Sequence, residues 1–364
     1  MRWKMLNIMV VFSILAGIDK ILNNRFGLGE KFDEGFKALG GLALTIIGIY
    51  SISPIVAKSL TPILYPLARV INTDPSVFIG SLLAPDLGGY TTSIGIAASR
   101  AVGEFNGLIL SSMLGTIISF TIPVAVGLIS KDDFYYFAKG VLAGIMTIPL
   151  GMIVGGLMMG LKAVDIIFSL IPVVVFSIII VFGLLKAQKS IIKIFNILGK
   201  IIIIVSTFGL ILSIVNFMFR IELIKGMIPI EEGAILVVKI GIILSGAYPM
   251  FHVISRILHK YLSKIGKKFE LDEYSILGIF SSLANCIPML GIYDKMNEKG
   301  KILNAAFAVS GAFTFGGQLG YISSVSPETV NPFIISKLAA GISAILVAVL
   351  LLKLEKPRRG EYEN

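Results

Sequence analysis

Cysteine, histidine, tryptophan and charged residues are all scarce in this sequence. Its 364 residues include one Cys, two His and one Trp, and only 15% of the chain is charged. The single cysteine, Cys286, excludes an internal disulfide, and it leaves too few ligands for a Cys/His metal cluster. No H-E-x-x-H, G-x-x-x-x-G-K-[ST] or G-x-S-x-G pattern occurs. We therefore expect neither an enzyme nor an ATP-driven pump, and no cofactor.

Apolar residues are abundant instead, at 55% of the chain with a mean hydropathy of +0.90. A soluble domain of this length would be far more polar. Stretches of about 20 apolar residues recur along the chain, and in lipid such stretches must be helical. We predict a single all-α polytopic membrane domain over residues 1–364, with lipid rather than nucleic acid as its surroundings. The predicted crossings are 3–22 (a first helix rather than a cleaved signal), 35–57, 103–128, 134–160, 164–185, 191–219, 235–257, 300–325 and 330–352.

Two further apolar segments, 76–97 and 272–292, are interrupted by residues that break helices. The first contains Pro85-Asp86-Leu87-Gly88-Gly89 and the second Asn285-Cys286-Ile287-Pro288. We predict discontinuous segments that enter and leave the membrane on one side, giving about nine crossings and two re-entrant segments. The alternative is that they cross, which gives ten or eleven crossings.

The distribution of Lys and Arg favours the re-entrant arrangement. The net charge is +10, and cytoplasmic loops of membrane proteins are enriched in positive charge. If every segment crossed with an internal N-terminus, the tail with Lys353, Lys356, Arg358 and Arg359 would lie outside. With an external N-terminus and two re-entrant segments, this tail and most other loop Lys and Arg face the cytoplasm.

Similar residues recur at a separation of about 200 positions, as in chains with internal repeats. Leu83-Ala84 pairs with Leu283-Ala284, Asn106 with Asn304, and Lys139 with Lys337. We predict repeat units over 35–160 and 235–352, inverted with respect to each other in the membrane. Inverted repeats with paired broken helices are typical of secondary transporters, which bind their solute near the midplane.

Five motifs, in order along nearly the full length, resemble the EutH ethanolamine permease family. They begin at Phe32, Leu83, Gly140, Gly246 and Leu283 and read FDEGFKALGGLAL, LAPDLGGY, GVLAGIMTIPLG, GAYPM and LANCIPM. The resemblance implies uptake of ethanolamine across the bacterial cytoplasmic membrane. The chain departs from the family pattern at Gly317-Gln318, where the family has an Asp-His pair, and at Cys286, where it has a second Asn. These departures leave open another small amine or amino alcohol, and a receptor or scaffold that transports nothing remains a further alternative.

The residue types in and near the broken segments suit a small ammonium with one hydroxyl. Asp86 is the expected acceptor for the cation, because a carboxylate at membrane depth is costly and therefore points to function. The alternative for Asp86 is a turn residue that bonds to its own backbone. The other expected site residues are Gly88, Gly89, Tyr90, Tyr248, Asn285, Cys286, Gln318 and Tyr321, with tyrosine rings offering faces to the cation. We expect Cys286 to lie near the cavity and to react with small polar thiol reagents.

Two lysines inside predicted helices, Lys139 and Lys337, are expected to extend along their helices to the membrane surface. The sequence leaves the coupling ion, the direction of transport and the oligomeric state open.

Overall fold

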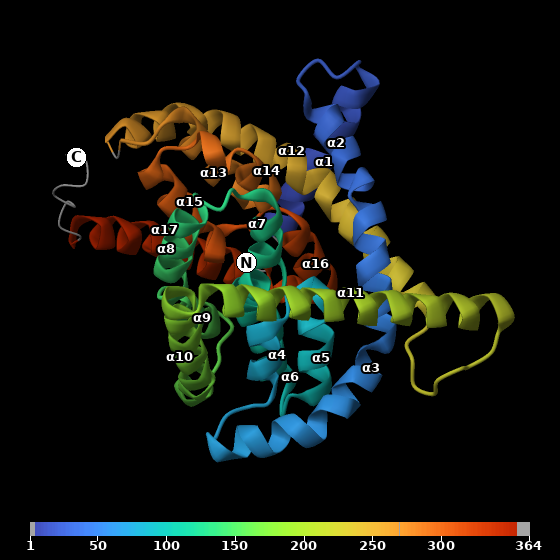
Figure 1. The fold of residues 1–364 in the computed structure, drawn as a ribbon. Helices are drawn as coiled ribbons and strands as arrows, with labels where there is room; N and C mark the ends of the chain where they lie inside the picture. The colour runs from blue at the N-terminus through green and yellow to red at the C-terminus, as the bar shows by residue number, and fades with distance from the viewer. Residues whose placement is uncertain (1–3, 269, 355–364) are drawn as a thin grey trace.

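The computed structural model describes residues 4–268 and 270–354, and in these residues the chain consists of helices and connecting turns without β-strands. Figure 1 shows the bundle, with α11 lying across one face in this view. The first helices are α1 (Lys4–Ile21), α2 (Leu28–Lys37), α3 (Leu39–Val70), α4 (Ser76–Leu82), the 3-10 helix η1 (Pro85–Leu87), α5 (Gly89–Ile96), α6 (Arg100–Glu104), the π-helices η2 (Phe105–Gly115) and η3 (Ile117–Thr121), and α7 (Ile122–Leu128). They are followed by α8 (Phe134–Ile145), α9 (Ile148–Met158), α10 (Ala163–Lys186), α11 (Gln188–Phe219), α12 (Ile230–Lys268), α13 (Glu273–Ala284), α14 (Cys286–Gly291), η4 (Tyr293–Lys295), α15 (Glu298–Gly311), α16 (Gly317–Val325), η5 (Pro327–Thr329) and α17 (Val330–Leu354).

Within residues 4–268 and 270–354, seven helical stretches are long and apolar enough to cross a membrane, judged by length and composition. They span 28–70, 100–128, 134–158, 163–184, 190–219, 230–257 and 327–354. This confirms an all-helical chain with several candidate membrane spans. The predicted crossing 3–22 forms α1, which is not among the seven because Lys4, Asp19 and Lys20 lie within its 18 residues.

Helix α3 extends well beyond the predicted crossing of residues 35–57. It continues to Val70 through Pro54, Pro62 and Pro66, and it curves visibly in Figure 1. A proline removes one backbone hydrogen bond and bends a helix, but membrane helices tolerate this where neighbouring groups satisfy the freed carbonyl. The helix therefore continues through all three prolines.

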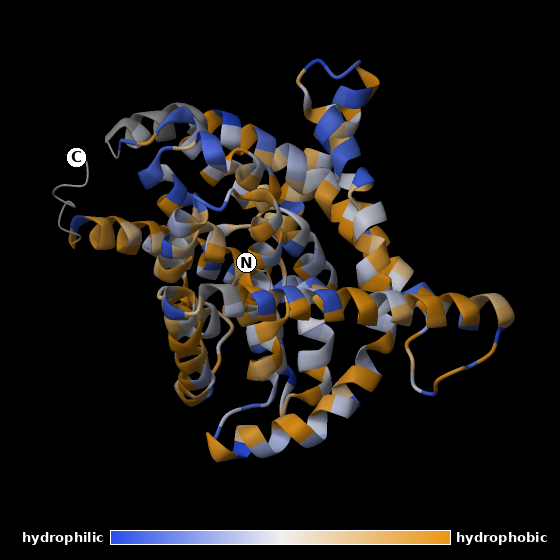
Figure 2. Ribbon diagram, viewed as in Figure 1, coloured by the Kyte–Doolittle hydropathy of each residue, from blue (hydrophilic) through white to orange (hydrophobic). Residues whose placement is uncertain are grey.

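The outer helices expose apolar side chains, as expected of a surface that faces lipid. Along α10, for example, Phe182 is 60% exposed, and on α11 the exposed fraction of Ile204 is 65%. Figure 2 shows these two helices largely in the hydrophobic colour, whereas hydrophilic residues gather on α2 and the turn before it. Exposed apolar area on this scale is unfavourable in water and is stable in a bilayer.

Both predicted breaks are present. The first separates α4 from η1 and α5 by extended backbone at Leu83 and Ala84, and Gly88 follows with a φ of 95°. The second separates α13 from α14 at Asn285, whose backbone is also extended. Gly88 therefore occupies a left-handed conformation that suits glycine.

A third break, which the sequence analysis did not anticipate, divides the predicted crossing 300–325 into α15 and α16. The intervening residues 312–316 run beside the second break, where the N–H of Phe313 donates to Ser282 O (2.9 Å) and the N–H of Phe315 donates to Leu283 O (2.8 Å). The prediction of one continuous crossing was wrong here. The non-helical backbone of each segment bonds to the other, which is how irregular backbone persists at membrane depth.

The π-helix η2 lies inside the bundle, and all of its 11 residues are buried. It packs against the first break so closely that a Cβ atom on Gly115 would lie 2.1 Å from Leu83 O. The predicted crossing 103–128 is thus helical but wider than an α-helix in its first half. Such wide turns occur frequently at functional sites.

Candidate functional site

A cavity of about 410 Å³ lies where the three breaks meet α3, α12 and η3. Its polar lining comes chiefly from Asp86 at the first break, Asn285 at the second and Gln318 just after the third. Thus three of the expected site residues, far apart in the sequence, line one space. Concave sites that are mostly apolar and contain a few polar groups are typical of small-molecule binding.

Asp86 is the acidic residue of the lining. The turn around it is held by backbone bonds, because the N–H groups of Leu87 (3.0 Å) and Gly89 (2.9 Å) both donate to Ala84 O. Among the described residues, no group of another residue donates a hydrogen bond to the Asp86 carboxylate. Asp86 is half-buried, and its carboxylate is free to accept hydrogen bonds from a molecule in the cavity.

Asn285 occupies the corresponding position in the second break. Its side-chain oxygen accepts a hydrogen bond from the N–H of Ile287 (2.9 Å) and so caps the start of α14. Capping by Asn is common because it satisfies a free N–H at a helix start. With its oxygen committed, the amide nitrogen of Asn285 remains available to the cavity as a donor.

Gln318 belongs to a buried hydrogen-bond chain that the sequence analysis missed. The ammonium of Lys337 donates to Gln318 Oε1 (2.9 Å), and Gln318 Nε2 donates to Thr116 Oγ1 (2.6 Å). Lys337 also donates to Ser112 O (2.6 Å) and is only 1% exposed. The prediction that Lys337 extends to the membrane surface was therefore wrong. Its helix is apolar on all sides, so the sequence did not indicate which face is turned inward.

Three aromatic side chains contribute to the wall, which otherwise consists mostly of small and aliphatic residues. Tyr248 lines the cavity as expected, together with Phe120 and Phe313, whose rings meet edge to face with centroids 5.6 Å apart. Both phenylalanines were missed, because an apolar residue in an apolar segment carries no distinguishing signal. Their faces and that of Tyr248 could contact a cation.

The other expected site residues lie behind the lining rather than on it. Tyr90 and Tyr321 contact each other edge to face, with centroids 6.2 Å apart, and Tyr321 is 2% exposed. Cys286 is completely buried, so the structure does not place its thiol on the cavity wall. The last two expected residues, Gly88 and Gly89, lie in the short segment between Asp86 and Tyr90.

Gly88 and Gly89 have structural roles in this geometry. Gly88 provides the positive φ, and a Cβ on Gly89 would lie 2.1 Å from Ser111 Oγ and 2.6 Å from Ala84 O. They let the first break approach η2 and thereby position Asp86. Neither glycine is part of the lining.

No group of three His, Cys, Asp or Glu side chains within the described residues is arranged to hold a metal ion. The chemistry available at the cavity is therefore one carboxylate, amide and hydroxyl groups, and aromatic faces. This set suits recognition of a small cation that also carries a hydrogen-bonding group.

Comparison with known proteins agrees with the sequence resemblance. The family described as "Ethanolamine utilisation protein, EutH" matches residues 2–351. The protein named "Probable ethanolamine permease EutH" from Listeria monocytogenes serotype 1/2a (strain 10403S) is 41% identical over 344 residues, covering 94% of this chain and 92% of its own. Its namesake from Escherichia coli (strain K12) is 36% identical over 386 residues, covering 96% and 95%.

A third relative, "Uncharacterized protein YxeR" from Bacillus subtilis (strain 168), is 41% identical over 341 residues, with 94% of this chain and 92% of its own covered. No solved structure matches the chain. The family match and the matches to these relatives all extend over nearly the whole length of this chain. The chain belongs to the EutH family of ethanolamine utilisation proteins.

Proposed function

We propose that this protein is a permease that carries protonated ethanolamine across the bacterial cytoplasmic membrane. The observation that carries the proposal is the Asp86 carboxylate, which accepts no hydrogen bond from another described residue and lies in a cavity lined in part by three helix breaks. Relatives over nearly the full chain that are named as probable ethanolamine permeases support the choice of substrate.

The lining suggests how the substrate is oriented. The ammonium binds at Asp86, where a carboxylate offsets its charge and the ring of Tyr248 offers a face. The hydroxyl then reaches the amide groups of Gln318 or Asn285. Because the protein supplies these groups ready-made, the substrate exchanges its hydration for fixed partners.

The proposed topology has about nine crossings and two re-entrant segments, with inverted repeats over 35–160 and 235–352. A matched pair of contacts supports the repeat. Asn106 Nδ2 donates to Ser76 Oγ (2.9 Å), and Asn304 Nδ2 donates to Ser275 O (2.9 Å). In each unit the contact joins the first half of the broken segment, α4 or α13, to the helix that comes after the whole segment, η2 or α15. If the units are inverted, the two breaks open toward opposite faces of the membrane.

The topology places Met1 outside and the tail inside. Both Met1 and the tail residues Lys356, Arg358 and Arg359 lie outside the described residues, so reporter fusions are the direct test. Reporters at the two ends should score on opposite sides of the membrane. Both on one side would rule out an odd number of crossings.

The test of function is uptake of labelled ethanolamine into proteoliposomes that contain only this protein, compared with empty liposomes. Saturable uptake supports the permease. Saturable binding without uptake would instead favour the receptor or scaffold alternative. A second candidate, transport of a larger amino alcohol, is favoured by the cavity volume of about 410 Å³, which exceeds what ethanolamine alone would fill, and competition by longer amino alcohols would reveal it.

A further inference from the structure

The buried ammonium of Lys337 lies one side chain behind the wall of the cavity. It comes from α17 and has two protein acceptors, Gln318 Oε1 (2.9 Å) and Ser112 O (2.6 Å), with the ring of Phe333 5.4 Å from Nζ. A lysine in a membrane-embedded interior is costly and is rarely kept without a role. The cavity lining itself does not include Lys337, so it would act through its charge and through Gln318.

Lys337 fixes the direction of the hydrogen bonds at this wall. An ammonium only donates, so the oxygen of Gln318 must face Lys337 and its amide nitrogen must face away. That nitrogen donates to Thr116 Oγ1 (2.6 Å), and the Thr116 hydroxyl in turn donates to Ser111 O (2.9 Å). Gln318 and Thr116 both line the cavity, so the wall offers the second N–H of Gln318 to a hydroxyl of the substrate.

The cavity thus has a carboxylate, Asp86, on its surface and the amine of Lys337 behind Gln318. Like charges repel strongly where water is excluded. A molecule with one ammonium and one neutral polar end satisfies both ends of such a site. A molecule with two ammonium groups places its second charge toward Lys337, where the amide N–H of Gln318 is also a donor and offers it no acceptor.

We propose that Lys337 is a specificity-determining residue that restricts the site to monocations and excludes small diamines. The inference rests on the proposed function, since it assumes that the ammonium of the substrate binds at Asp86. Lys337 acts in two ways, by repelling a second cation and by holding Gln318 as a donor toward a hydroxyl.

Ethylenediamine is the probe, because it has the size of ethanolamine with a second amine in place of the hydroxyl. At mildly acidic pH both of its amines are protonated. In proteoliposomes with the wild-type protein, ethylenediamine should compete with labelled ethanolamine at least about tenfold less well than unlabelled ethanolamine, a difference of about 1.4 kcal/mol. Equal competition would overturn the proposal without any variant.

Lys337→Gln isolates the charge, because a glutamine amide can still donate to Gln318. We expect this variant to lose most of the preference against ethylenediamine, whereas Lys337→Arg retains it. The matched control is Lys139→Gln, which neutralises a lysine whose Nζ lies 5.6 Å from the ring centroid of Tyr135, a residue outside the lining, and it should leave the preference unchanged. An unchanged preference in folded Lys337→Gln would overturn the proposal.

Ligand-dependent thermal stabilisation in detergent separates this inference from the proposed function. If the wild-type protein takes up no ethanolamine, the permease proposal fails, but stabilisation by ethanolamine and not by ethylenediamine would still support the role of Lys337. If Lys337→Gln does not fold, the wild-type comparison of the two ligands decides: equal stabilisation by both overturns the inference.

Discussion

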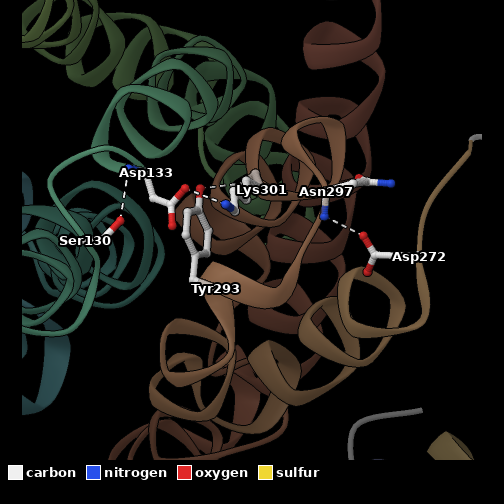
Figure 3. Close-up of polar contacts among 6 residues, drawn as sticks. All are labelled: Ser130, Asp133, Asp272, Tyr293, Asn297 and Lys301. Carbon is white, nitrogen blue, oxygen red and sulfur yellow. Dashed lines mark hydrogen bonds and ion pairs between the residues drawn. The ribbon is translucent and has the colours of Figure 1, made fainter.

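The ammonium of Lys301 forms a buried ion pair with the carboxylate of Asp133, joining the start of α15 to the start of α8. Figure 3 shows this pair with Tyr293, whose hydroxyl donates to Lys301 O (2.8 Å). Each side chain of the pair is only about a tenth exposed, at 11% and 12%. Buried charges of this kind are stable only while both partners are present.

We therefore expect Lys301→Met or Asp133→Leu alone to lower the free energy of unfolding by about 3–5 kcal/mol, because each leaves an unpaired buried charge. The double variant should recover much of that loss. Thermal unfolding in detergent measures the effect. The control is Lys20→Ala, which breaks the exposed pair with Asp33 and should lower the free energy of unfolding by at most about 1 kcal/mol. If the double variant of Lys301 and Asp133 lost as much stability as the two single variants together, this view of the pair would be contradicted.

The neighbouring glycines of the third break make a sharper test of packing. A Cβ on Gly316 would lie 1.8 Å from Ala284 O, whereas a Cβ on Gly317 would meet nothing within 4 Å. Gly316→Ala must push the third break away from the second, so we expect a severe loss of folded protein. Gly317→Ala should fold normally and reduce transport only by narrowing the cavity, because Gly317 lines it.

Folded yield after detergent extraction checks both variants, with thermal unfolding as a second measurement. Equal yields for the two alanine variants would mean that the close approach of Gly316 to Ala284 is not required.

The sequence predicted two of the three breaks and missed the third, although Gly316 and Gly317 lie at its end. Pro85, Gly88 and Asn285 disfavour a continuous helix by themselves, and they led correctly to two interruptions. Residues 312–316 are mostly apolar, and their departure from helix depends on hydrogen bonds to Ser282 and Leu283. Such bonds between distant segments leave no local pattern.

The lining of the candidate site was likewise predicted only in part. Asp86, Asn285, Tyr248 and Gln318 were expected and do line one cavity, because polar or aromatic residues beside breaks are informative. Thr116 and Lys337 were not expected at the site. Thr116 lies between η2 and η3, and Lys337 lies on α17. Tertiary packing turns both inward, and hydropathy alone gives neither the inward face of an apolar helix nor its π-helical turns.

Thiol labelling tests the placement of the second break. Because Cys286 is fully buried, we now expect its thiol to resist small polar reagents, in contrast to the sequence-based expectation. Asn285→Cys in a Cys286→Ser background should react, because Asn285 lines the cavity, and ethanolamine should slow that reaction. The membrane side from which the reagent acts reports the side on which the segment enters.

Mass spectrometry of the labelled protein gives the rates. Rapid labelling of Cys286, together with an Asn285→Cys variant that does not react, would show that position 286 faces the cavity and position 285 does not.

The decisive substitution for the cavity is Asp86→Asn. The turn at Asp86 is held by the N–H groups of Leu87 and Gly89 on Ala84 O, so the fold does not depend on the carboxylate, and both Asn and Ala at position 86 should give normal folded yield. Uptake of ethanolamine should nevertheless fall by at least about a hundredfold, because the loss of a charge-assisted contact to the ammonium in a site with little water costs about 3 kcal/mol.

Tyr90→Phe is the matched control for the neighbourhood of Asp86. Tyr90 lies behind the lining and contacts Tyr321 through its ring, so removal of the hydroxyl should leave uptake within about twofold of the wild type, a change of only about 0.4 kcal/mol. Initial rates of uptake at several ethanolamine concentrations distinguish weaker binding from slower transport. If Asp86→Asn folds and transports ethanolamine normally, Asp86 does not bind the cation. The polar groups of Asn285 and Gln318 are then the next candidates for binding it.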